Sequence, residues 1–362
     1  MNNDNNFITK VLPIIFFIIF VIVVIGLIKI TKGVDIDNKE KVVEDVTTNV
    51  TEETTTVKKA EDNNINKLLV SYNGKLSIDN NTLVNEHGEK IQLRGISSHG
   101  IQWFGDLVTK ENLITLRDEW GANLFRVAMY TKENGYIDNK SIKNKVFDIV
   151  DMVIDLDMYV IIDWHILSDN NPNMNKEEAI KFFDEVSNKY KDKKNVIYEI
   201  CNEPNGSTSW NNDIYPYAVD VIKTIRNNSK DSIIIVGTPT WSQGVLDASK
   251  KPIDDKLTMY ALHFYSGTHK NDLRNNATTA LKTIPIFVSE FGVSDASGNG
   301  GVYLDEADKW INWMNENNIS WANWSLADKD ESSALLIPGK KLIKDENLSK
   351  SGKYIKNIMK KR

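Results

Sequence analysis

The sequence predicts an α/β protein built as a (β/α)8 TIM barrel. Eight short apolar, β-prone runs recur along the chain, and amphipathic helical segments lie between most of them. These runs fall within residues 67–362, a length close to the roughly 250 residues typical of such barrels. An open, doubly wound sheet is the structural alternative, but no Gly-rich phosphate-binding loop follows the first run.

The elements of the barrel can be placed in order. A short N-terminal hairpin is expected first, over Leu68–Leu93, with its turn near Glu86-His87-Gly88. The predicted strands are centred near Arg94-Gly95-Ile96, Leu124-Phe125-Arg126-Val127, Val160-Ile161-Ile162, Val196-Ile197-Tyr198, Ile233-Ile234-Ile235, Met259-Tyr260-Ala261, Ile286-Phe287-Val288 and Trp321-Ala322-Asn323-Trp324. Among the intervening helices, residues 142–156 place five apolar side chains on one face, namely Val146, Ile149, Val150, Val153 and Ile154.

The first 66 residues are predicted to lie outside the barrel. Residues 1–10 are a short tail, and residues 11–30 are an apolar run long enough to cross most of a ~30 Å hydrocarbon core as a helix. No small-residue cleavage signature follows, so we expect a retained transmembrane anchor, with a cleaved signal peptide as the alternative. Residues 31–66 contain no aromatic residue and no proline, which predicts a disordered linker.

Composition excludes several classes of function. The net charge is -6 and no arginine-rich run is present, which argues against nucleic acid as a partner. Cys201 is the single cysteine, so no internal disulfide can form. No His-x-His, His-Glu-x-x-His or paired-cysteine pattern occurs, and no Gly-x-Ser-x-Gly elbow. We therefore expect no metal, no other cofactor and no serine nucleophile.

Two of the predicted strands end in a glutamate beside a turn-forming residue. Glu203 precedes Pro204, and Glu290 ends the run that begins at Ile286. Carboxylates at the C-terminal ends of barrel strands are well placed for chemistry. Glycoside hydrolysis needs two such groups, one as proton donor and one as anionic partner. Either glutamate alone could cap a turn or pair with a lysine, but the two together favour catalysis.

Polar and aromatic side chains gather at the ends of the other predicted strands. They are Ser97-Ser98-His99, Arg126, Asp163-Trp164-His165, Asn202, Trp241, His263-Phe264-Tyr265 and Trp324. Three of the five histidines of the chain belong to this set. A lone histidine at a strand end is more often structural. A ring of such groups at one end of a barrel instead predicts a binding or catalytic site.

These motifs resemble those of glycoside hydrolase family 5, and within it the bacterial endoglucanases with the motif Gly-Ile-Ser-Ser-His-Gly, here residues 95–100. The resemblance extends over residues 68–360. The matching segments are Leu93–Trp103, Phe125-Arg126-Val127, Asp163-Trp164-His165, Tyr198–Pro204, His263-Phe264-Tyr265, Ser289–Gly292 and Trp321–Leu326. The resemblance implies a retaining endo-β-1,4-glucanase.

The resemblance also implies a role for each group near the reacting bond. Glu203 matches the acid/base and Glu290 the nucleophile. Arg126 and Tyr265 match residues that hydrogen-bond the nucleophile, and an ordinary buried ion pair is the plain alternative for Arg126. The remaining supporting residues are His165 and His263, which match histidines flanking the two carboxylates, and Asn202, which matches the amide that binds the sugar 2-hydroxyl.

Further residues resemble the family's sugar-binding positions. Trp324 matches the platform at the cleavage subsite, Trp103 a glycone platform and Trp241 an aglycone platform. An aromatic ring buries the apolar face of a pyranose. The positions that match hydrogen-bonding residues for glycone hydroxyls are His99, Tyr130, Lys329 and Glu331. For Lys329 and Glu331 a solvated charge run is the alternative.

We therefore predict a membrane-tethered endo-β-1,4-glucanase with a monomeric catalytic domain and a β-glucan partner. Polymeric glucan cannot cross a membrane, so a single-pass protein of the cell membrane would carry this domain outside the cell; secretion after signal cleavage is the alternative. The rival functions are the same mechanism on mannan, xyloglucan or mixed-linkage glucan, and a catalytically inactive carbohydrate-binding surface protein. Because the sequence ends soon after the eighth helix, we expect no appended carbohydrate-binding module and better activity on soluble than on crystalline glucan.

Overall fold

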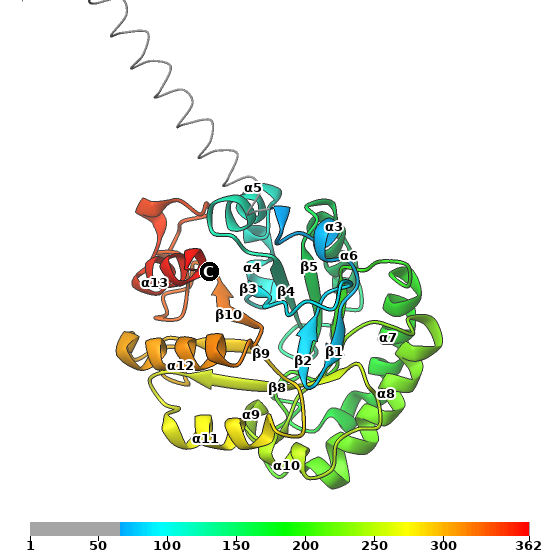
Figure 1. The fold of residues 1–362 in the computed structure, drawn as a ribbon. Coiled ribbons are helices and arrows are strands. Elements are labelled where there is room, and N and C mark those ends of the chain that lie inside the picture. Colours follow the sequence, from blue (N-terminus) through cyan, green and yellow to red (C-terminus); the bar gives the residue numbers. More distant parts are fainter. Residues whose placement is uncertain (1–65, 362) are drawn as a thin grey trace, which may run out of the picture. The chain divides into compact units, whose positions relative to one another are not determined.

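The computed structural model describes residues 66–361 (Figure 1). The predicted tail (1–10), the predicted anchor (11–30) and all but the last residue of the predicted linker (31–66) lie outside the described residues. Within residues 66–361, no helix combines the length and the apolar character needed to cross a membrane. The anchor therefore stays a prediction.

The eight predicted strands form one closed, parallel barrel (Figure 1). In chain order they are β3 (Arg94–Ser98), β4 (Leu124–Tyr130), β5 (Tyr159–His165), β6 (Val196–Glu199), β7 (Ile234–Val236), β8 (Thr258–Tyr265), β9 (Ile286–Gly292) and β10 (Trp321–Leu326). Each strand pairs with the next, and β10 closes the barrel by pairing with β3. The predicted α/β barrel is confirmed.

Helices connect the strands and cover the outside of the barrel (Figure 1). The longer helices are α6 (Ile142–Asp155), α7 (Lys176–Lys189), α8 (Tyr215–Asn228), α11 (Asn271–Ala280), α12 (Leu304–Glu316) and α13 (Lys350–Lys360). The shorter ones are α3 (Val70–Asn73), α4 (Ile101–Phe104), α5 (Lys110–Ile114), α9 (Pro239–Ser242) and α10 (Val245–Ser249). Short 3₁₀ or π turns lie at Gly105–Leu107, Thr115–Glu119, Pro172–Asn175, Trp210–Ile214 and Asp345–Asn347. The helix predicted over residues 142–156 is α6, and its apolar face packs against the barrel.

The N-terminal hairpin is present, but its turn was predicted in the wrong place. β1 (Ser77–Asp79) and β2 (Thr82–Val84) pair antiparallel through the two-residue turn Asn80-Asn81. Both asparagines have positive φ, which asparagine tolerates better than most residues. The expected turn at Glu86-His87-Gly88 is a second chain reversal, across which Val84 and Lys90 form an antiparallel bridge.

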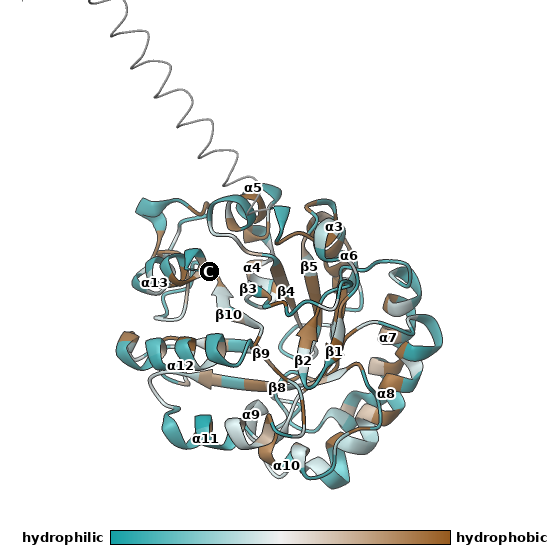
Figure 2. Ribbon diagram, in the orientation of Figure 1, coloured by the Kyte–Doolittle hydropathy of each residue, from teal (hydrophilic) through white to brown (hydrophobic). Residues whose placement is uncertain are grey.

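The hairpin closes the amino-terminal end of the barrel. Leu76 and Leu83 join one apolar cluster with Ile161, Ile197 and other side chains from the strands. Burial of such side chains contributes about 1.5–3 kcal/mol each. Figure 2 shows that the barrel strands are mainly hydrophobic, whereas the helices present hydrophilic residues on their outer faces. With one end filled by apolar side chains, the carboxyl ends of the strands are left to form a site.

Candidate active site

A cleft of about 810 Å³ lies at the carboxyl ends of the strands. Most of the predicted site residues line it: His99, Trp103, Tyr130, His165, Glu203, Trp241, His263, Tyr265, Glu290, Trp324, Lys329 and Glu331. The two exceptions, Arg126 and Asn202, are fully buried and reach the lining residues from inside the barrel. The fold thus brings all the predicted residues to one place.

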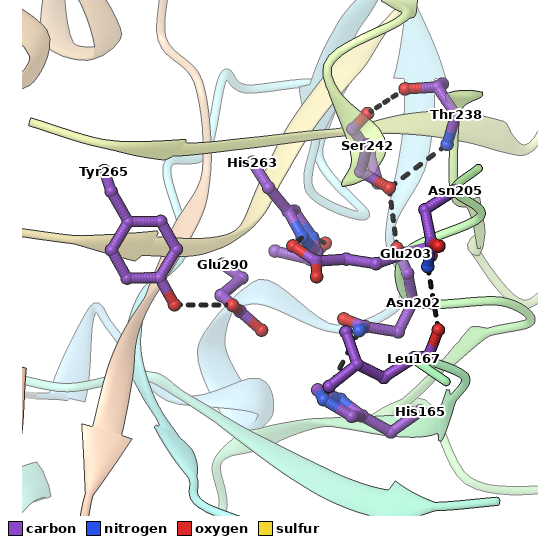
Figure 3. A network of polar contacts seen from close by, with 12 residues as sticks. His165, Leu167, Asn202, Glu203, Asn205, Thr238, Ser242, His263, Tyr265 and Glu290 are labelled. Carbon is purple, nitrogen blue, oxygen red and sulfur yellow. Dashed lines mark hydrogen bonds and ion pairs between the residues drawn. The ribbon is translucent and has the colours of Figure 1, made fainter. Parts of the chain in front are cut away.

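The loop after β6 holds Glu203 in position through its backbone carbonyls. Ser242 Oγ donates to the carbonyl of Asn202 at 2.6 Å, and Asn205 Nδ2 donates to the carbonyl of Glu203 at 2.9 Å (Figure 3). A buried carbonyl without a partner would be costly, so these contacts favour a single loop conformation. The Glu203 side chain itself is half-buried and reaches the cleft.

Glu203 and Glu290 approach each other closely in the cleft (Figure 3). One carboxylate oxygen of each, together with a ring nitrogen of His263, lie within 4.8 Å of one another. Retaining glycosidases hold their two carboxyl groups about 5–5.5 Å apart, whereas inverting enzymes need about 6.5–9.5 Å to admit a water molecule. The observed spacing matches the retaining arrangement.

Both oxygens of the Glu290 carboxylate accept hydrogen bonds. Arg126 Nη1 donates to Oε2 at 3.0 Å. The Tyr265 hydroxyl donates to Oε1 at 2.8 Å (Figure 3). Gly292 makes room for this tyrosine, because a Cβ at that position would lie 2.4 Å from the Tyr265 ring. Two donors on a carboxylate that is only 4% exposed fix its orientation in the cleft.

Arg126 is the centre of a buried cluster of acidic groups. Its Nε donates to Glu199 Oε2 at 2.7 Å, and its Nη2 lies 3.0 Å from Asp163 Oδ2 and 2.6 Å from Asn202 Oδ1. Burial alone would lower the pKa of Arg126, but the charges of Asp163, Glu199 and Glu290 outweigh it and raise the pKa above its usual value. Glu199 was not predicted as a site residue.

His263 connects Glu203 to a second buried chain of polar groups. Its Nδ1 lies 3.0 Å from Glu203 Oε1 and its Nε2 lies 2.9 Å from Ser289 Oγ. Ser289 in turn donates to Glu199 Oε1 at 2.6 Å. Burial opposes a charge on His263, but hydrogen bonding and charge from Glu199, Glu203 and Glu290 raise its pKa to about 9. Ser289, like Glu199, was not predicted.

His165, unlike His263, is held in its neutral form. Its Nδ1 lies 2.6 Å from Asp163 Oδ2, and its Nε2 lies 3.3 Å from Asn202 Nδ2. Burial, together with the nearby charge of Arg126, lowers the pKa of His165 to about 3. Burial also raises the pKa of Asp163 well above its usual value. His165 is therefore neutral at ordinary pH, and it stacks on Trp324 with ring centroids 5.3 Å apart.

Glu203, His263 and Glu290 have the donor types of a metal site, but their contacts do not suit one. Both nitrogens of His263 face partners, and its raised pKa keeps a proton where a metal would need a lone pair. Both oxygens of Glu290 already accept hydrogen bonds. We assign no metal to this group.

Two of the three predicted tryptophan platforms are exposed at the cleft. Trp103 is 46% exposed and Trp241 is 45% exposed, whereas Trp324 is 5% exposed and forms part of the cleft wall. Exposed tryptophan beside a cleft suits stacking against a sugar ring. The His99 ring contacts both Trp103 and Trp324, and the Tyr130 ring contacts His99 and Trp103.

Trp241 is presented by an unusual turn. Thr240, Trp241 and Ser242 all have φ between 52° and 59°, a left-handed conformation that costs non-glycine residues roughly 1–2 kcal/mol each. Contacts with the Glu203 loop hold this turn, because the Trp241 amide donates to the carbonyl of Pro204 at 3.0 Å and Ser242 bonds Asn202. The platform and the loop that carries Glu203 are therefore one structural unit.

Lys329 and Glu331 both line the cleft. They form an ion pair with each other, and the Ser333 hydroxyl also donates to Glu331. Asp328, from the same run, pairs with Lys341 instead. The Glu331 side chain is 9% exposed, so a solvated run of charges does not describe it, whereas the Lys329 side chain is 46% exposed and still fits that alternative.

Some residues differ from expectation. Trp164, grouped with the strand-end aromatics, points away from the cleft and packs in the outer core against Phe182.

The cleft is also lined by residues that no motif singled out: Glu133, Leu167, Gln243, His269, Ala296, Ser297 and Gly298. Glu133 has a φ of 55°, and its Oε2 is buried without a hydrogen-bond partner. The positive φ of Glu133 is visible only in the structure, so nothing in the sequence indicated that this residue lines the cleft.

Comparison with known proteins identifies the family. The pattern of the Cellulase (glycosyl hydrolase family 5) family matches residues 84–330. The chain belongs to glycoside hydrolase family 5. It is 53% identical over 291 residues to Endoglucanase 5 of Pectobacterium carotovorum subsp. carotovorum, covering 79% of this chain and 58% of that protein. It is 57% identical over 254 residues to Endoglucanase A of Evansella cellulosilytica, covering 70% of this chain and 52% of that protein.

Solved structures of family 5 members share the fold. The crystal structure of the catalytic domain of Thermobifida fusca endoglucanase Cel5A in complex with cellotetraose superposes with a TM-score of 0.78 at 36% identity, covering 80% of this chain and 98% of that one. The curated relatives named above are longer, so this chain spans between half and three fifths of their length. The family 5 assignment thus concerns the barrel.

Proposed function

We propose that this chain is an endo-β-1,4-glucanase that cuts internal bonds of cellulose-type glucans with retention of anomeric configuration. The observation that carries the proposal is the approach of Glu203 and Glu290 within 4.8 Å. Glu203 gives its proton to the glycosidic oxygen while Glu290 attacks the anomeric carbon. The bond between that carbon and the glycosidic oxygen breaks, the leaving sugar chain departs with a free hydroxyl, and a glycosyl ester of Glu290 remains. Water then attacks the same carbon, loses a proton to Glu203 and releases Glu290.

The contacts around the two carboxylates support these roles. Arg126 and Tyr265 hold the Glu290 carboxylate in one orientation, as a nucleophile requires. Glu203 is the carboxyl group that faces His263 and is free of Arg126. It can therefore change its protonation state twice in each cycle, which a general acid and base must do.

The cleft supports a glucan as substrate. Trp103 and Trp241 provide stacking surfaces, and Lys329 and Glu331 provide hydrogen-bonding groups on the wall. Relatives named endoglucanase support the same substrate class. Mannose carries an axial 2-hydroxyl, which would redirect the contact expected from Asn202. A site built around one hydroxyl geometry leaves polar groups unpaired with the other sugar.

We also propose that the catalytic domain acts outside the cell, at the end of a membrane anchor formed by residues 11–30. The support is the apolar run of that segment and the size of the substrate, because polymeric glucan does not cross membranes.

The substrate proposal is tested by digesting soluble polysaccharides with the purified protein. Carboxymethylcellulose and mixed-linkage β-glucan should be cut, with mannan and xylan much poorer substrates. Viscosity should fall well before reducing ends accumulate, as internal cleavage requires. The Glu290→Ala variant, prepared in the same way, controls for contaminating enzymes. A faster rate on β-mannan than on either glucan would refute the substrate assignment and leave the mechanism standing.

A further inference from the structure

Glu199 is a fully buried carboxylate that the proposed reaction does not use directly. We propose that Glu199 is a positioning residue for the acid/base: acting through Ser289, it fixes a proton on Nε2 of His263 and stabilises positive charge on that ring beside Glu203. The proposal rests on the proposed function, since it assigns Glu203 as the acid/base.

The hydrogen-bond directions follow from the chemistry of each group. An ionised carboxylate can only accept, so the 2.6 Å contact between Glu199 Oε1 and Ser289 Oγ uses the single hydrogen of the serine hydroxyl. Ser289 Oγ can then only accept from His263 Nε2, which lies 2.9 Å away. The proton on Nε2 is therefore fixed by Glu199, two hydrogen bonds away.

With a proton fixed on Nε2 of His263, Nδ1 is the ring nitrogen that interacts with Glu203. Nδ1 lies 3.0 Å from Glu203 Oε1. When Glu203 has given its proton to the leaving oxygen, a protonated Nδ1 donates to the new carboxylate and stabilises it. No proton has to leave the ring for this effect. The Glu199 carboxylate, with Oε1 3.7 Å from Nε2, stabilises the positive charge on the His263 ring.

The charged surroundings of His263 agree with this arrangement. From β6 and its loop it faces Glu199 and Glu203, and from β9 it faces Glu290. The remaining titratable groups near it, Asp163 and His165, lie on β5. The carboxylates outweigh the effect of burial, so the pKa of His263 is raised to about 9. His165 is buried as well, but burial and the nearby positive charge of Arg126 lower its pKa.

A simpler role for Glu199 would be to support Arg126 alone, since Arg126 Nε donates to Glu199 Oε2 at 2.7 Å. The two roles predict different results for Glu199→Gln. The glutamine oxygen can still accept from Arg126. Its amide group, however, donates towards Ser289, whose hydroxyl is then free to donate to His263 Nε2. The positioning role predicts a change at His263, and the supporting role predicts none.

The test is an NMR titration of the full chain labelled with ¹⁵N in its histidine rings. The chain has five histidines, so individual signals can be assigned by substitution. The Glu199→Gln variant should lower the pKa of His263 by about 1–3 units, the effect typical of a lost neighbouring charge. It should also move the proton preference of the neutral ring away from Nε2. An unchanged His263 titration in a folded Glu199→Gln protein would overturn the proposal.

Two further variants keep the test decisive. Asp163→Asn removes another acidic partner of Arg126 without touching the relay, so it should lower the His263 pKa by less than Glu199→Gln does. A fall as large as that in Glu199→Gln would show a general effect of the cluster and overturn the proposal. Ser289→Ala breaks the relay without contacting Arg126, and should lower the His263 pKa by a smaller amount because Glu199 remains nearby. If the Glu199→Gln variant does not fold, an unchanged His263 pKa in Ser289→Ala would likewise overturn the proposal.

Kinetics then test the link to Glu203. In Glu199→Gln, kcat/KM should fall about 10- to 100-fold for cello-oligosaccharides, whose leaving group needs a proton, with little change for an aryl cellobioside with a good leaving group. Equal losses on both substrates would overturn the link to the acid/base. The titration needs no substrate, so it gives its result even if the protein proves inactive on glucans.

Discussion

His99 gives a stability prediction that can be worked out from the structure. Its Nδ1 accepts a hydrogen bond from the Gly100 amide at 2.7 Å, which requires that nitrogen to be unprotonated. The ring is 6% exposed and lies among Trp103, Phe104 and Trp324. Burial, with a smaller contribution from the positive charge of Lys329, lowers the pKa of His99 to about 3.

The sign and size of the effect follow by linkage. An unfolded histidine takes up a proton near pH 6.5, whereas folded His99 resists protonation down to about pH 3. Stability is therefore lost as the pH falls below about 6.5. Each pH unit within that window costs about 1.4 kcal/mol, so lowering the pH from 7 to 5 should cost about 2 kcal/mol through this residue alone.

Urea unfolding at pH 7 and pH 5 measures this cost. The control is His99→Asn, whose side-chain oxygen can accept from the Gly100 amide but cannot titrate in this range. The original protein should lose about 2 kcal/mol more than the variant between the two pH values. Equal losses for both proteins would refute the reasoning, whatever their absolute stabilities.

Two other predictions concern catalysis and location. Glu203→Ala should lose roughly 10²–10⁴ in rate on natural glucans but retain activity on aryl glycosides with good leaving groups, whereas Glu290→Ala should lose both; equal residual activity of the two variants on an aryl glycoside would contradict their roles. The full chain should fractionate with membranes and keep its first residues, and N-terminal sequencing that starts between Thr31 and Leu68 would show a cleaved signal instead.

The residues at the carboxyl ends of the strands were the part of the structure that the sequence predicted best. Apolar runs set the eight strands, and parallel strands bring their carboxyl ends together, so residues as distant as His99 and Trp324 could be placed at one site. The roles of Glu203 and Glu290 came from resemblance, and their spacing agrees with those roles. The first hairpin turn was missed because Gly88 is a strong turn signal, and it does mark a reversal, whereas the tighter turn uses Asn80 and Asn81, which carry positive φ without a glycine.

Residues inside the barrel were harder to predict. Glu199 and Ser289 sit beside recognised motif residues, but their contact joins β6 to β9 and depends on side-chain positions that no local pattern gives. The error on Trp164 was avoidable. Side chains alternate along a strand, so inward-facing Asp163 and His165 require Trp164 to face outward.

The most direct test of the central claim is the anomeric configuration of the first product, followed by NMR during hydrolysis of a cello-oligosaccharide. Carboxylates separated by the distance seen here between Glu203 and Glu290 should act by double displacement. The account predicts that the β anomer appears first and then mutarotates. The α anomer appearing first would contradict it.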